Sequence, residues 1–266
     1  MVKGVGVGLR SQFSHERDKI IQNVDFLEIN FGSGVDYKEE FGDFLGKIPC
    51  VIHSVNLSLG SVEPPPRNRV DFLKGATDFL RPSWVSEHLS FSRNNDIEIN
   101  NFIALPYTDE AIEIACRNIS DLQSYLGVKV ALENVTHSFT WSENTYTEAE
   151  FIKNISEKAN CGLLLDVTNL HINSRVHGYD PYEFLENMPK DRVLQLHIAG
   201  HSEMEGVLYD THVGGIHQEV LQYAEWVLQH TSCDAVVIER DNEINLFDDL
   251  ISDINLCKEL YNKYRR

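Results

Sequence analysis

The chain has 266 residues, which suits one large domain, and 42% of them are apolar, so we expect a packed core rather than a disordered chain. The 41 acidic residues against 23 basic ones give a formal net charge of −18. Because binding to nucleic acid or to an anionic membrane needs clustered Lys and Arg, this charge argues against such partners. Part of the acidic excess could be carboxylates that bind cations.

No apolar run approaches the roughly 18 residues of a membrane span. The N-terminal stretch MVKGVGVGLR lacks the long apolar region and cleavage site of an export signal, so none is expected. The five cysteines are odd in number, widely spaced and without a Cys-x-x-Cys pair. This pattern is typical of reduced cysteines in a cytoplasmic protein, although one of them could be a reactive thiol.

Short β-rich runs alternate along the chain with longer segments of amphipathic, helical character. The expected strands are Gly4–Leu9, Asp25–Ile29, Ile48–His53, Trp84–His88, Val128–Glu133, Gly162–Asp166, Val193–His197 and Ala235–Glu239. The clearest expected helices are Arg67–Leu80, Asp109–Leu126, Glu148–Ala159, Gln218–Gln229 and Leu246–Tyr261.

Several of these runs, such as VALE, GLLLD and AVVIE, are apolar up to their last residue. Such runs are typical of strands that are buried on both faces of a parallel sheet. Eight strands, each followed by a helical segment, predict an α/β fold of the (β/α)8 TIM barrel type. An open doubly wound sheet is the main alternative. No composition shift, linker or repeat divides the chain, so we expect residues 1–266 to form a single domain.

Gly4, Gly6 and Gly8 alternate along the first expected strand. They lack the G-x-G-x-x-G order of a dinucleotide-binding loop, and no helix start follows closely enough. We therefore interpret them as positions that leave room inside the barrel.

Six consecutive expected strands end in a potential metal ligand. These residues are His53, His88, Glu133, Asp166, His197 and Glu239. In a barrel the carboxyl ends of the strands form one ring around the mouth. A single His or Glu at a strand end is more often structural, but six together are costly to desolvate without cations. The pattern therefore predicts a metal centre.

Three further residues extend this ring and predict a site for another ion. Asn169 follows Asp166 by three residues, and an Asp-x-His pair, Asp210 and His212, follows His197 by thirteen. Imidazole and carboxylate ligands suit Fe, Zn or Mn, and the absence of cysteine ligands argues against an iron–sulfur cluster.

The order of these ligands is similar to that of the endonuclease IV and xylose isomerase superfamily of barrels. The one departure is Asn169, where endonuclease IV carries a histidine. The resemblance implies that His53 and His88 hold one ion and that Asp166 and His197 hold a second. It further implies that Glu133 and Glu239 bridge these two ions. A third ion would be held by Asn169, Asp210 and His212.

The sequence segments around the ligands resemble, more specifically, those of the multinuclear non-haem iron-dependent oxidases (MNIO family). Within this family they resemble the MbnB-like branch of methanobactin biosynthesis. The matching stretches include HSVNLSLGS, VSEHLSFS, LPYTDEA, LEN, CGLLLDVTNLHINS, LHIAGH, LYDTH and IERD. They cover nearly the whole chain in order. His171 stands where many relatives carry Tyr, so we do not expect it to be a ligand.

This resemblance implies an enzyme that holds two or three iron ions in mixed Fe(II)/Fe(III) states and uses O2 as co-substrate. It implies two partners, a ribosomally made MbnA-like precursor peptide and an MbnC-like protein that forms a hetero-complex with the enzyme. The implied reaction is a four-electron oxidation that converts a cysteine and the preceding amide to an oxazolone and a thioamide.

Two residues outside the ligand set are candidates for further roles. Asp241 lies two residues after Glu239 and should face the mouth. We hypothesise that it is the acid/base that moves the amide proton, and the alternative is a salt bridge to Arg240 or a lysine. His201 is either a substrate contact, a hydrogen-bond donor to a ligand, or an ordinary loop residue. The remaining histidines, His15, His137, His177, His217 and His230, are interpreted as surface or loop residues.

Four other functions stay open on the sequence alone. The chain could be another cysteine-modifying oxidase of the same family. It could also be an abasic-site endonuclease with zinc ions, although its charge is unfavourable for a polyanionic substrate. A sugar isomerase on the same scaffold and a protein whose metals are purely structural are the remaining alternatives.

Overall fold

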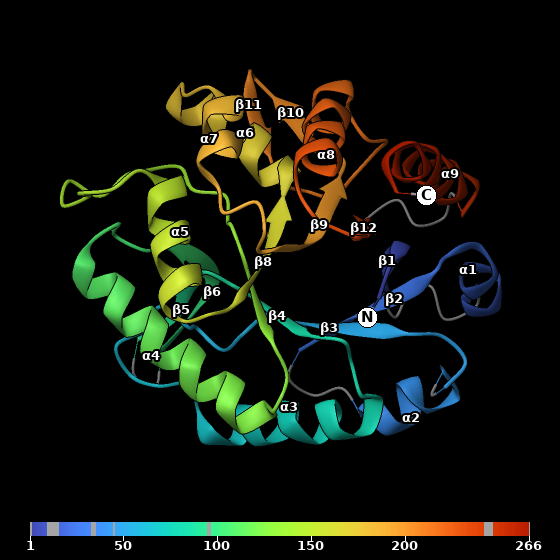
Figure 1. Ribbon diagram of the computed structural model, residues 1–266, viewed down its shortest axis with the longest axis horizontal. Helices are drawn as coiled ribbons and strands as arrows, with labels where there is room; N and C mark the ends of the chain where they lie inside the picture. Colours follow the sequence, from blue (N-terminus) through green and yellow to red (C-terminus); the bar gives the residue numbers. More distant parts are fainter. Residues whose placement is uncertain are drawn as a thin grey trace.

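The computed structural model describes residues 2–9, 16–32, 36–44, 46–94, 97–241 and 247–265. Within them, eight parallel strands close into a barrel in the order β1-β12-β9-β8-β7-β4-β3-β2 (Figure 1). The strands are β1 (Gly4–Leu9), β2 (Phe26–Phe31), β3 (Cys50–Ser54), β4 (Val85–His88), β7 (Val130–Glu133), β8 (Gly162–Asp166), β9 (Val193–Ala199) and β12 (Ala235–Glu239). The closed order confirms the predicted TIM barrel and excludes the open doubly wound sheet.

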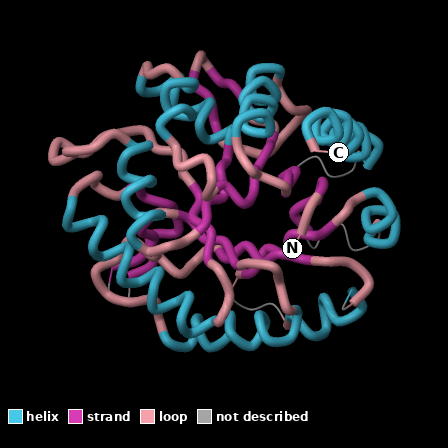
Figure 2. Tube along the Cα trace, in the orientation of Figure 1, coloured by secondary structure: helices cyan, strands magenta, loops and turns pink. Residues whose placement is uncertain are grey.

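Helices form an outer ring around these strands (Figure 2). They are α1 (Arg17–Asn23), α2 (Tyr37–Phe41) with the short 3-10 helix η2 (Gly42–Phe44), α3 (Arg67–Leu80), α4 (Asp109–Leu126), α5 (Glu148–Lys158), α6 (Val167–His177), α7 (Pro181–Asn187), α8 (Gln218–His230) and α9 (Phe247–Tyr264). The helices expected to start at Arg67, Asp109, Glu148 and Gln218 begin at those residues. Leu246, the expected start of the last helix, and His15 lie outside the described residues.

Two antiparallel hairpins follow strands of the barrel and were not predicted. The first joins β5 (Ser90–Asn94) to β6 (Ile97–Ala104), after β4. The second joins β10 (Ser202–Met204) to β11 (Val207–Tyr209), after β9. Both therefore lie on the side of the barrel where the parallel strands end.

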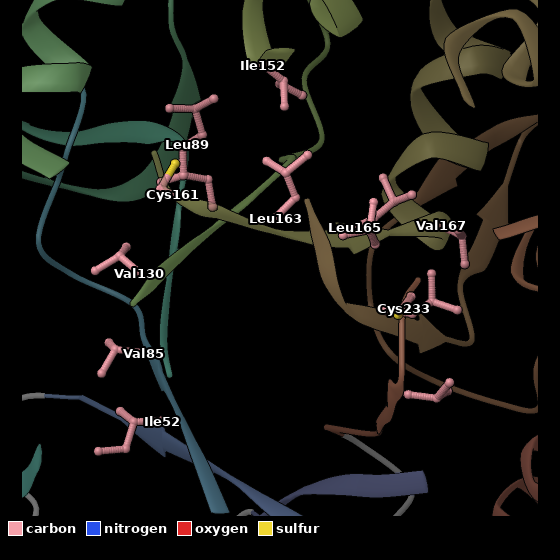
Figure 3. Packing of buried hydrophobic residues seen from close by; sticks show 14 of the residues in the cluster. Ile52, Val85, Leu89, Val130, Ile152, Cys161, Leu163, Leu165, Val167 and Cys233 are labelled. Atoms are coloured by element: carbon pink, nitrogen blue, oxygen red, sulfur yellow. The ribbon is translucent and has the colours of Figure 1, made fainter. Parts of the chain in front are cut away.

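The inside of the barrel begins with an apolar layer. Phe26, Trp84, Leu164 and Val237 belong to one small buried cluster. Leu163 and Leu165, the neighbours of Leu164 along the strand, belong instead to the larger core between strands and helices. Figure 3 shows this outer core. The run GLLLD is apolar because both faces of its strand are buried.

The next layer of inward-facing side chains, closer to the carboxyl ends of the strands, is polar. Because side chains alternate along a strand, the inward residue after Phe26 is Glu28, and the one after Leu164 is Asp166. Both carboxylates are fully buried. The same alternation carries polar groups from the other strands toward the mouth, so the barrel changes from apolar to polar along its axis.

All five cysteines are free, and burial raises the pKa of each thiol, so the reactive-thiol alternative gains no support. No helix within the described ranges is long and apolar enough to cross a membrane.

The inward glycines of β1 provide a test of the packing. A Cβ at Gly6 would lie 2.8 Å from the ring of Phe26, which is fully buried, whereas a Cβ at Gly8 would meet no atom closer than 3.6 Å. Gly6→Ala should therefore lower the free energy of unfolding by about 1–3 kcal/mol through overpacking. Gly8→Ala is the matched control and should change stability less. Denaturant unfolding measures both, and equal effects would contradict this account of the barrel interior.

Candidate metal centre

A cavity of about 690 Å³ opens at the carboxyl ends of the barrel strands. Most of the side chains predicted as ligands or as the acid/base line it: His53, His88, Glu133, Asp166, Asn169, Asp210, His212, Glu239 and Asp241. His197 does not line the cavity, but its fully buried ring contacts Glu133 and Glu239. The fold thus gathers ten of the eleven predicted side chains around one space.

The first group of donor atoms comes from β3, β4 and β7. The Oε2 atom of Glu133 lies 3.2 Å from Nε2 of His53 and 3.3 Å from Nε2 of His88. This oxygen is buried and makes no hydrogen bond within the described residues. Ligands that share an ion at about 2.1 Å lie roughly 3 Å apart, so these three side chains are spaced as co-ligands of one cation.

The second group shares Glu133 with the first and adds Asp166, His197 and Glu239, with donor atoms within 4.8 Å of one another. Nδ1 of His197 lies 3.1 Å from Oε1 of Glu133 and 2.9 Å from Oε2 of Glu239. The two oxygens of Glu133 therefore face different groups. This is the geometry of a carboxylate that can bridge two ions.

Asp166 is held rigidly at the junction of β8 and α6. Its Oδ1 accepts hydrogen bonds from the backbone amides of Thr168 (2.7 Å) and Asn169 (2.8 Å), so it caps the helix. The side chain of Asn134 bonds both the amide and the carbonyl of Asp166. Oδ2 of Asp166 is buried without a hydrogen bond, which leaves it available to a cation.

The residues predicted for a third ion line the same cavity. Asn169 donates its amide to the carbonyl of Asn134, and its Oδ1 is buried without a hydrogen bond. Nε2 of His212 lies 2.8 Å from Oδ1 of Asp210 and 3.8 Å from Oε2 of Glu239. Donor oxygens and one imidazole nitrogen are thus present, although these residues do not meet as closely as the first two groups.

Asp241 faces the mouth, as its position two residues after Glu239 predicts. Its Oδ2 accepts a hydrogen bond of 2.8 Å from Nδ1 of His212, and its side chain is 40% exposed. The neighbouring Arg240 is bonded to Asp253 on the other side of the strand. Arg240 therefore pairs with a different carboxylate, Asp253, while Asp241 is bonded to His212.

His201 is the predicted side chain that the structure does not bring to the cavity. Its ring lies between those of His171, at 5.0 Å, and His217, at 3.8 Å between centroids. His137 and His177 form another pair, stacked 4.3 Å apart. These clusters were not predicted, because ring stacking between distant loops leaves no spacing pattern in the sequence.

The charges of the centre show why cations fit it. Burial alone would raise the pKa of Glu133, but the imidazoles of His88, His53 and His197 bring it down to about 2. Burial, together with the carboxylates of Glu133 and Asp210, raises the pKa of Asp166 well above its ordinary value. The imidazoles thus favour the ionised form of Glu133, whereas burial beside other carboxylates disfavours the ionised form of Asp166. Bound cations would satisfy both, and the nitrogen and oxygen donors fit iron, zinc or manganese.

Sequence reasoning missed two polar residues of β2. Glu28 is fully buried and contacts His197. Asn30 lines the cavity, and both polar atoms of its side chain are buried without a hydrogen bond. Both share the inward face with Phe26, so the alternation along FLEIN was the signal that could have found them.

A family model described as "RiPP precursor modification enzyme MbnB/TglH/ChrH" matches residues 4–262. The chain belongs to this family. A UPF0276 protein of Caulobacter vibrioides is 33% identical over 270 residues and covers 99% of this chain and 96% of its own. A UPF0276 protein of Chromobacterium violaceum is 35% identical over 242 residues, with coverage of 90% and 88%.

Solved structures with the same fold are more distant in sequence. A D-tagatose 3-epimerase-like protein is 18% identical, with a TM-score of 0.60 and coverage of 98% of both chains. A xylose isomerase-like TIM barrel protein from Mycobacterium smegmatis, in complex with magnesium, is 12% identical, with a TM-score of 0.61 and coverage of 97% and 91%. At this identity the likeness establishes the fold type that the sequence analysis predicted.

Removal of metal should destabilise the protein. Cations that bind only the folded state stabilise it, by about 2.7 kcal/mol at a hundredfold excess over Kd. We therefore expect Fe(II) under anaerobic conditions, or Zn(II), to raise the melting temperature of chelator-treated protein, and we expect Glu133→Gln to reduce this rise. Differential scanning fluorimetry measures it. No rise with Fe(II), Zn(II) or Mn(II) would contradict the assignment of a metal centre.

A second cavity, of about 320 Å³, contains the carboxyl group of Glu148 and supplies a control residue. Burial raises the pKa of Glu148 to about 8, and its Oε2 is buried without a hydrogen bond. Glu148 is not among the residues that line the metal cavity. Glu148→Gln should therefore leave the metal-induced rise in melting temperature unchanged.

The same residue gives a pH dependence. Below its unfolded pKa of 4.5, Glu148 is protonated in both states and contributes no difference. Between that value and about 8, the unfolded chain releases the proton while the folded protein keeps it, so stability falls as pH rises. Glu148→Gln should remove this loss and gain about 1–3 kcal/mol at pH 7. Unfolding curves at pH 4.5 and 7 test this, and an equal effect at both would refute it.

Proposed function

We propose that this protein is a multinuclear non-haem iron oxidase that uses O2 to convert a cysteine of a ribosomally made precursor peptide to an oxazolone and a neighbouring thioamide. Its membership of a family of RiPP precursor modification enzymes supports the peptide substrate. The gathered imidazoles and carboxylates support the metal. The same family membership favours peptide modification over the endonuclease and isomerase alternatives.

The proposal rests mainly on the carboxylate of Glu133, whose two oxygens face different groups of donor atoms. Oε2 faces His53 and His88, and Oε1 faces His197, so one carboxylate touches both groups of donor atoms. We assign His53 and His88 to one ion and Asp166 and His197 to a second. Glu133 would bridge them. Glu239, which the resemblance implies as a second bridge, lies only in the group of Asp166 and His197, so it would hold the second ion.

A third ion is assigned to the loops beyond the strands. Asn169 contributes its spare Oδ1, and Asp210 and His212 contribute a carboxylate and an imidazole. An amide oxygen is a weaker ligand than the histidine of endonuclease IV, so this ion should be the most readily lost of the three. Two or three ions, in mixed Fe(II) and Fe(III) states, would then serve the reaction.

When iron is bound, it supplies the redox partner for O2 and a cation that stabilises the substrate sulfur as a thiolate. The reaction removes four electrons and four protons from the peptide, and one O2 becomes two molecules of water. The protein side chains position the peptide and move protons. The cavity of about 690 Å³ is large enough for a cysteine with its neighbouring peptide units.

Asp241 is proposed as the group that accepts the amide proton while the ring closes. Its carboxylate lines the cavity and is reached by solvent, so a substrate amide can approach it. The hydrogen bond from His212 holds the carboxylate in place at the cavity, where it can act as a proton acceptor. The peptide and an MbnC-like partner would cover the mouth and limit the access of water.

Reconstitution tests the iron assignment and the reaction together. Protein loaded anaerobically with iron, mixed with an MbnA-like peptide and an MbnC-like partner, should consume O2 and lower the peptide mass by four hydrogens. His53→Ala, Glu133→Ala and Glu239→Ala should each abolish this while the fold is retained. Respirometry and mass spectrometry follow the reaction, and circular dichroism follows the fold. A fully active Glu133→Ala enzyme would remove the bridging role.

Asp241→Asn isolates the proton transfer from metal binding. The asparagine oxygen can still accept the hydrogen bond from His212, but the amide cannot take a proton. We expect unchanged iron content and a turnover rate lowered about 10²–10⁴-fold. Elemental analysis and single-turnover mass spectrometry measure the two quantities. A rate within a few fold of wild type would exclude Asp241 as the base, and parallel loss of iron and rate would make it a support for His212.

A further inference from the structure

Below the metal cavity, the inward face of β2 carries a carboxylate that belongs to neither group of donor atoms. Glu28 is fully buried, and it does not line the cavity. Its Oε2 lies 2.9 Å from Nε2 of His197 and accepts a hydrogen bond from the side-chain amide of Gln195. The oxygen of that amide accepts a hydrogen bond of 2.8 Å from Nε1 of Trp84. A buried chain of hydrogen bonds therefore runs from the apolar layer to His197.

The contact between Glu28 and His197 determines which nitrogen of the imidazole carries the proton and which can bind a cation. Nδ1 faces the carboxylates of Glu133 and Glu239 at 3.1 and 2.9 Å. When Nδ1 binds a cation through its lone pair, the ring proton must sit on Nε2 and point at Glu28. Nε2 of Gln195 lies 2.8 Å from Nε2 of His197, and both nitrogens are within hydrogen-bond distance of Oε2 of Glu28. When both nitrogens carry hydrogen, Glu28 Oε2 is the acceptor that they share. Glu28 thus fixes the tautomer and the plane of the ring.

The arrangement is electrostatically asymmetric between the two groups. Behind His53, the partner of Nδ1 is the neutral hydroxyl of Ser86, at 2.9 Å. Behind His197 stands a carboxylate whose other oxygen, Oε1, is buried without a hydrogen bond near the space left by Gly8. Burial of a carboxylate with one oxygen left without a hydrogen bond costs free energy, so a purely structural role is a poor explanation for Glu28. A cation bound through His197 supplies the missing compensation.

We infer that Glu28 is a positioning residue for the second ion: it orients His197 and adds negative charge behind it, which favours the ion of higher charge there. The inference rests on the proposed metal centre. Acidic partners of metal-bound imidazoles typically change metal affinity about 10–100-fold. Added negative charge also stabilises the ferric over the ferrous state, so the second group is expected to hold Fe(III) and the first, with His53 and His88, Fe(II).

The test removes the negative charge of Glu28 and keeps the size and shape of its side chain. Glu28→Gln should fold with unchanged or higher stability as the metal-free protein, because a buried carboxylate has been removed. Anaerobic titration with Zn(II) alone should show one class of sites weakened about 10–100-fold. In iron-loaded protein, the reduction potential of the ferric ion should become more positive, and its Mössbauer fraction should fall. Unchanged affinity together with unchanged potential would overturn the inference.

Two further variants separate this role from general damage. Glu148→Gln removes a carboxyl group from the other cavity and should leave zinc affinity and potential as in wild type. Ser86→Ala removes the partner of His53 and should affect the first group without the change in ferric potential. Equal potential shifts in Ser86→Ala and Glu28→Gln would overturn the specific role of Glu28.

The outcome is distinguishable from failure of the proposed function. If Glu28→Gln weakens zinc binding but wild-type iron protein neither consumes O2 nor alters the peptide, the oxidase proposal fails while the positioning role stands. If wild type modifies the peptide and Glu28→Gln matches it in metal affinity and potential, the oxidase stands and the positioning role fails.

Discussion

The buried carboxylate of Glu133 is the group on which the site depends. Its two oxygens face imidazoles from three different strands, so one side chain joins two sets of donor atoms. A buried negative charge of this kind is tolerated only if positive charge surrounds it. Despite burial, neighbouring carboxylates raise the pKa of His88 and of His197, which favours their charged forms, and metal ions would supply further positive charge. The charges of the centre therefore depend on one another, because the loss of one partner leaves a buried charge uncompensated.

The barrel makes this possible by separating apolar and polar layers along its axis. Phe26 and Leu164 fill the lower part, and the next inward residues of the same strands, Glu28 and Asp166, are carboxylates. Each carboxylate is then fixed by hydrogen bonds that come from elsewhere in the fold. Asp166 is bonded by helix α6 and by Asn134, and Glu28 is bonded by Gln195 and His197. Rigid support of this kind holds donor atoms close together despite their charge.

The barrel and most of the candidate ligands could be predicted from the sequence, because a strand that ends in a ligand reveals both the strand and the position of the ligand. The apolar run gives the strand, and its last residue gives the position at the mouth, as in GLLLD and AVVIE. Glu28 was missed because it lies inside a strand rather than at its end, where only the alternation with Phe26 places it on the inward face. His201 follows its strand closely but lies outside the cavity. The turn at Gly200 packs against the backbone of Val213 and Gly214, a contact between distant loops that no local pattern reports.

The central claim, that Glu133 joins two ions, is tested most directly by anomalous diffraction at the iron edge from crystals grown anaerobically with iron. The account predicts two strong anomalous peaks on opposite sides of the Glu133 carboxylate, one beside His53 and His88 and the other beside Asp166 and His197, with a weaker third beside Asp210 and His212. A single peak, or peaks that Glu133 does not touch, would contradict it.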